Sequence, residues 1–145
     1  MRAPGPDWLA LDCHREADRI AGAIRSALGR ELRRRGLVLG ISGGIDSSVT
    51  AALCVKAVGK ERVIGLQMPE RHSSGETLGL SGILATHLEI ETVVWDITPV
   101  LEAVGFYDRY DAAVRAAVPE YGPGWRSKIV VPEIAEDARL TVFSV

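Results

Sequence analysis

A glycine- and serine-rich loop between an apolar run and a helical pattern constrains this chain more than any other feature. The run Leu37-Val38-Leu39-Gly40-Ile41 has the length and composition of a buried strand. It leads directly into Ser42-Gly43-Gly44-Ile45-Asp46-Ser47-Ser48, and a helical pattern over 49–58 follows at once. This order predicts an α/β fold with the loop at the carboxyl end of a strand, where open α/β sheets bind ligands.

The loop Ser42–Ser48, called the phosphate loop below, combines groups that bind phosphate. Its two glycines let the backbone approach an anion closely, and its three serines offer hydroxyls. The positive end of the following helix points at the same place. Asp46 can hold a metal ion that bridges phosphate oxygens, so the sequence predicts a phosphate site with a metal at this carboxylate.

An ordinary tight turn is the alternative interpretation of the same residues, with Asp46 or Ser47 as a helix cap. A turn needs only one glycine and one cap, whereas this loop has two glycines, three hydroxyls and a carboxylate. No lysine follows the glycines, which excludes the Walker loop, and the chain contains no Gly-x-Gly-x-x-Gly.

Size and composition narrow the class of protein. The 145 residues fit one domain, and 47% apolar with 25% charged residues is typical of a globular protein. A net charge of −2 gives no general reason to bind nucleic acid or an anionic membrane. The basic residues of 30–35 suit a solvated helix end. Two cysteines and no signal peptide predict reduced thiols, a cytoplasmic protein and no zinc site.

Helical and strand patterns alternate along the chain, which implies a parallel sheet. We expect a single domain over 1–145, with a tail over 1–10, a nucleotide-binding unit over 11–104 and an extension over 105–145 that holds short strands at Lys128–Pro132 and Leu140–Val145. The expected helices are Leu11–Arg35, 49–58, Glu76–His87, Pro99–Val104 and Tyr110–Val118, and the expected strands are Leu37–Ile41, Val63–Met68 and Thr92–Trp95.

The residues resemble a known family. Ser42-Gly43-Gly44-Ile45-Asp46-Ser47 resembles the pyrophosphate loop of the N-type ATP pyrophosphatases, and its surroundings are most similar to ammonia-dependent NAD synthetase. The similar segments are Val38–Ile41, Met68-Pro69 followed by Ser73-Ser74, and Val93–Pro99. The resemblance covers about residues 15–104. The chain departs from it at Leu80-Ser81, where the family usually carries an aspartate followed by an alanine.

This resemblance implies a Rossmann-like fold of the adenine-nucleotide alpha-hydrolase type. We therefore expect a three-layer open parallel sheet with helices on both faces, incomplete at the C-terminus. The implied activity is that of an ATP-dependent amide ligase, here in a truncated form. ATP adenylates the carboxylate of nicotinic acid adenine dinucleotide, ammonia displaces AMP, and pyrophosphate is released. The resemblance also implies a homodimer.

The implied cofactors are ATP and Mg²⁺, with Asp46 as the metal ligand and no residue assigned as a catalytic nucleophile. The phosphate loop would hold the pyrophosphate, strand residues would face the nucleoside, and the backbone of 67–68 would lie against the adenine. Arg71, His72 and Asp96 are weaker candidates, and Ser73 and Ser74 are expected to cap a helix. The implied nucleotide-binding residues are Gly40, Ile41, Ser42, Gly43, Gly44, Ile45, Asp46, Ser47, Ser48, Gln67 and Met68.

Two other functions remain open. The chain could be another ATP pyrophosphatase of this superfamily, amidating or thiolating a different substrate. A thiolating enzyme would be expected to carry cysteines near the site, and Cys13 and Cys54 are poorly placed for that. It could also be a non-catalytic ATP-binding module that keeps the loop alone.

Overall fold

The computed structural model describes residues 10–73, 75–122 and 124–125. Two compact units divide the chain, Met1–Asp96 and Ile97–Val145, and each is described by itself. The strands expected at Lys128–Pro132 and Leu140–Val145 lie outside the described residues, as does most of the expected tail. The division into a tail, a unit and an extension stays a prediction.

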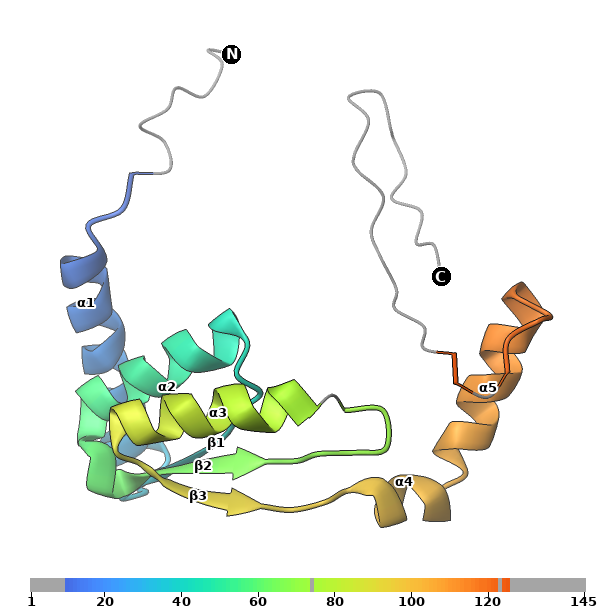
Figure 1. Cartoon of the computed structure of the whole chain (residues 1–145). Helices are drawn as coiled ribbons and strands as arrows, with labels where there is room; N and C mark the ends of the chain where they lie inside the picture. The colour runs from blue at the N-terminus through green and yellow to red at the C-terminus, as the bar shows by residue number, and fades with distance from the viewer. Residues whose placement is uncertain (1–9, 74, 123, 126–145) are drawn as a thin grey trace. The chain divides into compact units, whose positions relative to one another are not determined.

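The first unit contains the expected parallel sheet (Figure 1). Its strands are β1 (Leu37–Gly40), β2 (Val63–Gln67) and β3 (Glu91–Val94), in the order β1-β2-β3. Both pairings are parallel, with Leu37 opposite Val63 and Gly65 opposite Thr92. The carboxyl ends of all three strands therefore reach the same edge of the sheet, and the phosphate loop begins there.

Helices connect the strands and cover one face of the sheet. The helical segments of this unit are α1 (Cys13–Ser26), η2 (Ala27–Glu31), α2 (Ile45–Val58), η3 (Lys60–Arg62) and α3 (Gly75–Leu88). Helices α2 and α3 contact the strands, and α1 packs on α2 (Figure 1). The core between α2, α3 and the sheet is formed by Ile41, Ala51, Cys54, Val63, Ala85 and Ile90.

The other face of the sheet carries apolar side chains that remain open to solvent in the described residues. Successive side chains of a strand point to opposite faces of the sheet. Leu37 and Leu39 pack on the core, so the side chain of Val38 points to the other face. The exposed fraction of Val38 is 67%, and that of Val93 is 43%. The described part of this unit thus holds the sheet and one helix layer of the expected three-layer fold.

The first helix ends earlier than its apolar pattern predicts. We expected it to reach Arg35, but the α-helix ends at Ser26 and a π-helical turn closes at Glu31. Arg33 then takes a positive φ of 51°. A Cβ on Gly36 would lie 2.9 Å from the Arg62 carbonyl oxygen. This glycine therefore serves the close approach of two backbones where β1 meets β2, and the chain needs residues 32–36 to turn into the sheet.

The second unit consists of two short helices, α4 (Thr98–Ala103) and α5 (Phe106–Ala117), which contact each other. The α5 helix begins four residues before the expected Tyr110, because Gly105 at φ 66° turns the chain directly into it. Tyr107 and Val114 are buried on this helix. Among the described residues, no helix has both the length and the apolarity that a bilayer crossing requires.

Candidate functional site

The phosphate loop leaves the end of β1 in a conformation that only certain residues allow. Ile41 is buried at 4% exposure, and its N–H donates to the Leu66 carbonyl over 3.0 Å, which anchors the start of the loop to β2. Gly43 has φ 75°, and a Cβ there would lie 2.5 Å from the Leu80 Cβ. The loop therefore packs on α3 at a point where a side chain does not fit.

Serine hydroxyls stabilise the loop from within. Ser47 Oγ and Ser48 Oγ donate to the Gly44 carbonyl over 3.0 and 2.8 Å. The Gly44 N–H donates to Ser42 Oγ over 3.3 Å, and Ser42 Oγ lies 3.2 Å from Ser47 Oγ. These hydrogen bonds order the loop, and the hydroxyl oxygens keep further lone pairs for a ligand's donors or a bound cation.

The start of α2 has no side-chain cap. Its N-cap residue is Gly44, so neither Asp46 nor Ser47 caps the helix as the ordinary-turn interpretation required. The N–H groups of the first turn have no acceptor within the helix and carry the positive end of the helix dipole. An uncapped helix N-terminus behind a glycine loop is a general anion-binding arrangement.

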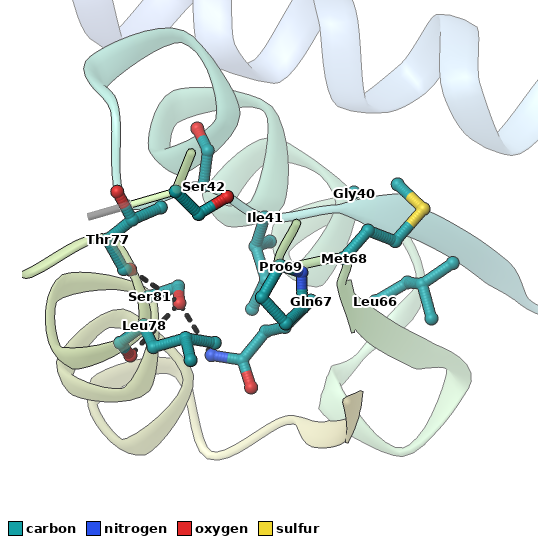
Figure 2. Close-up of a pocket in the computed structure, with 11 residues that line it drawn as sticks. Gly40, Ile41, Ser42, Leu66, Gln67, Met68, Pro69, Thr77, Leu78 and Ser81 are labelled. Atoms are coloured by element: carbon teal, nitrogen blue, oxygen red, sulfur yellow. Dashed lines mark hydrogen bonds between the residues drawn. The ribbon is translucent and has the colours of Figure 1, made fainter. Parts of the chain in front are cut away.

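A pocket of about 280 Å³ opens beside the loop, between the ends of β1 and β2 and the helix α3 (Figure 2). We call it the strand-end pocket. Five of the predicted nucleotide-binding residues line it, and a Cβ on Gly40 would touch the Met68 Cε at 3.4 Å. The other six predicted residues form the remainder of the phosphate loop. The lining residues are Gly40, Ile41, Ser42, Leu66, Gln67, Met68, Pro69, Ser73, Thr77, Leu78 and Ser81.

The residues of α3 that line the strand-end pocket were not predicted from the sequence. Thr77, Leu78 and Ser81 line the pocket from this helix, and Ser81 Oγ accepts a hydrogen bond from Gln67 Nε2. Thr77 and Ser81 are four residues apart, so they share one helix face. Two hydroxyls at that spacing in the first half of this helix, next to leucines and glycines, were the available signal.

Asp46 is exposed in the first turn of α2, next to the loop. Among the described residues, no group of three or more His, Cys, Asp or Glu side chains is arranged to hold a metal. A single carboxylate is a weak metal site alone. It suits Mg²⁺ that arrives on phosphate oxygens, since this ion keeps several waters and takes one or two protein carboxylates.

The weaker candidates lie apart from the pocket lining. Arg71 and His72 are exposed in the loop after β2, and Asp96 is exposed beyond β3. Ser73 lines the pocket, and its Oγ accepts the Glu70 N–H over 3.0 Å, so this hydroxyl stabilises the loop after β2. Ser74 lies outside the described residues.

The parallel sheet, the Ser-Gly-Gly-x-Asp-Ser loop and the uncapped helix beside the strand-end pocket place the chain in the class of open α/β domains with a phosphate-binding loop. The family model of NAD synthase matches residues 17–118 of the chain. The chain belongs to the NAD synthase family.

Two curated relatives are NH(3)-dependent NAD(+) synthetases. The protein of Mesorhizobium japonicum is 50% identical over 134 residues, covering 92% of this chain and 42% of the relative. The protein of Rhizobium meliloti is 53% identical over 139 residues, covering 96% of this chain and 41% of the relative. The chain thus spans about two fifths of the length of these relatives.

Solved structures agree with the fold. An NH3-dependent NAD synthetase from Campylobacter jejuni, in complex with the nitrate ion, has a TM-score of 0.60 and 26% identity, with 77% of this chain and 52% of that chain covered. An NMN synthetase from Francisella tularensis has a TM-score of 0.59 and 26% identity, with 67% and 40% covered.

Proposed function

We propose that this chain forms the ATP-binding part of an amide ligase of the NAD synthetase type. The observation that carries the proposal is the uncapped N-terminus of α2 behind Gly43 and Gly44, beside a pocket at the carboxyl ends of β1 and β2. Phosphates at the loop and a base in the pocket would together account for both features.

The groups of ATP are assigned to the site as follows. The phosphate loop holds the pyrophosphate portion through first-turn N–H groups, and through serine hydroxyls whose protons turn from their partners within the loop to the phosphate oxygens when the anion binds. Asp46 holds Mg²⁺, which neutralises phosphate charge when bound. The nucleoside lies against Gly40 and Ile41, and the adenine against the backbone of Gln67 and Met68.

The proposed reaction has two steps. A carboxylate oxygen of the acceptor attacks the α-phosphorus of ATP, the bond to the bridging oxygen of the β-phosphate breaks, and pyrophosphate leaves with that electron pair. Ammonia then attacks the carboxyl carbon, loses a proton and displaces AMP, which leaves an amide. The protein contributes positioning and stabilisation of phosphate charge, so no covalent nucleophile is needed.

The acceptor we propose is nicotinic acid adenine dinucleotide or a close analogue, with ammonia as the nitrogen source. The names of the relatives from Mesorhizobium japonicum and Rhizobium meliloti support this choice. The structural similarity to an NMN synthetase makes the corresponding mononucleotide the second acceptor to test. We also propose that the functional form is a homodimer.

A thiolating function is less well supported. Cys54 is buried in the core, and burial raises the pKa of its thiol, which disfavours the reactive thiolate. Cys13 is exposed at the first position of α1 rather than at the strand ends. A non-catalytic ATP-binding module would share the same site, and only an assay of turnover with the acceptor separates it from a ligase.

Calorimetry with an Asp46→Asn variant tests the ATP site. We expect the affinity for Mg-ATP to fall about tenfold or more, which corresponds to about 1.4 kcal/mol, while the affinity for metal-free ATP changes little. Asp108→Asn is the matched control, because Asp108 is also an aspartate in the first turn of a helix, α5, but lies in the second unit. A folded wild-type chain that does not bind ATP contradicts the proposal, as do equal effects on both forms of ATP.

A further inference from the structure

The described residues include two buried polar side chains, and both line the strand-end pocket. Gln67, the last residue of β2, is 6% exposed, and Ser81, in the middle of α3, is 1% exposed. In Figure 2 the Gln67 amide points toward the Ser81 hydroxyl, and a dashed line marks the hydrogen bond between them. Burial of polar groups is unfavourable unless they hydrogen-bond, so this contact is energetically coupled to the packing of α3 on β2.

The direction of the hydrogen bond follows from the serine's other partners. Ser81 Oγ lies 2.9 Å from the Thr77 carbonyl and 3.1 Å from the Leu78 carbonyl, both on its own helix. A hydroxyl has one proton and a carbonyl can only accept, so the proton goes to the helix. The serine oxygen then accepts from Gln67 Nε2, which ties the end of β2 to α3.

The same turn of α3 also touches the phosphate loop. A Cβ on Gly43 would lie 2.5 Å from Leu80 Cβ and 2.9 Å from the Ser81 backbone nitrogen, so the loop rests on this turn. Ser81 therefore stands between two parts of the site. Its backbone supports the loop at Gly43, and its hydroxyl holds Gln67, whose neighbour Met68 forms the other end of the pocket.

We propose that Gln67 and Ser81 are a positioning pair that sets the spacing between the phosphate loop and the base end of the pocket, and so favours a complete nucleotide over a phosphate fragment. The inference rests on the proposed ATP site. A ligand that spans both ends, such as ATP, depends on this spacing. Inorganic pyrophosphate occupies only the loop, so its affinity does not depend on the pair.

Two variants cut the link in different ways. Ser81→Ala removes the acceptor and leaves the Gln67 amide buried without its partner, which also destabilises the fold. Gln67→Met keeps the length of the side chain and removes the donor, while Ser81 still donates to Thr77, so its cost in stability is smaller. Thr86→Ala is the matched control, because Thr86 Oγ1 donates to the Gly82 carbonyl over 2.9 Å on the exposed face of the same helix.

Calorimetric titration with Mg-ATP and with inorganic pyrophosphate provides the test. We expect Gln67→Met and Ser81→Ala each to lower the affinity for Mg-ATP about tenfold, while the affinity for pyrophosphate stays within about twofold of the wild-type value. The control Thr86→Ala should bind both ligands like wild type. The double variant Gln67→Met with Ser81→Ala should recover thermal stability, because both polar partners are then gone, without recovering the preference for ATP.

Three results overturn the inference. If Gln67→Met lowers the affinities for Mg-ATP and pyrophosphate equally, or changes neither affinity, the pair does not set the spacing. Recovery of ATP affinity together with stability in the double variant means that the pair only supports the fold. A wild-type chain that binds neither ligand overturns the proposed function, and this inference with it. If the wild-type chain binds both ligands and the variants still give one of the first two results, only the role of the pair is overturned.

Discussion

Gly43 is the residue on which the shape of the phosphate loop depends most directly. Its φ of 75° lies in the left-handed region, and a Cβ there would lie 2.5 Å from Leu80 Cβ. Backbone strain and a steric clash therefore act together at one position. By contrast, Gly79 lies within α3, and a Cβ added to it would have no atom within 4 Å, so a methyl group there meets open space.

We predict that Gly43→Ala lowers the free energy of unfolding by about 1–3 kcal/mol and abolishes nucleotide binding, since the loop must move away from α3. Gly79→Ala, the control with the same chemical change, should raise the free energy of unfolding by about 0.5–1 kcal/mol. Urea denaturation and calorimetry measure both effects. A Gly43→Ala chain that keeps its ATP affinity would show that the loop conformation is not required.

The sequence predicted one side of the site and missed the other for a physical reason. Residues of β1, the phosphate loop and the end of β2 follow from local patterns, because a strand, a glycine turn and a helix are contiguous in the chain. Thr77 and Ser81 become part of the pocket only through the way α3 packs across β2, which depends on distant residues. Ser81 also occupies a position where the resembling family usually has alanine, so the family pattern did not indicate its hydrogen bond.

Within the described residues the α-helices and strands follow the expected order, whereas the ends of several helices differ from the prediction. The apolar spacing of the first helix continues to Leu32, but the backbone leaves the α-helix at Ser26 and the π-helical turn at Glu31. The reason lies in tertiary structure, because the chain must enter β1 next to Arg62. At α5 the opposite happens, since Gly105 starts a helix four residues before its pattern indicates.

Helix α2 links the phosphate loop to the core. Two adjacent alanines lie on its buried and on its exposed face. Ala51 is 0% exposed within the core cluster, and Ala52 is exposed. We predict that Ala51→Leu lowers the free energy of unfolding by about 1–3 kcal/mol through overpacking. Ala52→Leu should change it by less than about 0.5 kcal/mol. Chemical denaturation of both variants checks this, and equal effects would contradict the packing of α2 on the sheet.

At the scale of the whole molecule, exposed apolar side chains bear on assembly. Leu11, which precedes α1, is 64% exposed, and Leu32, which follows η2, is 62% exposed. We predict a homodimer that covers these side chains, with a mass of twice 15.6 kDa by light scattering. Leu32→Glu should shift the chain towards the monomer. A wild-type chain that stays monomeric over a wide concentration range would rule the dimer out.

Hydrogen exchange with and without Mg-ATP shows whether a nucleotide lies along the phosphate loop and the strand-end pocket. We predict that Mg-ATP slows exchange of the amides over 42–48 and 66–68. Amides over 35–38 and 60–62, at the opposite ends of β1 and β2, should keep their rates. Unchanged exchange at the loop, or protection confined to other segments, would show that the nucleotide does not bind there.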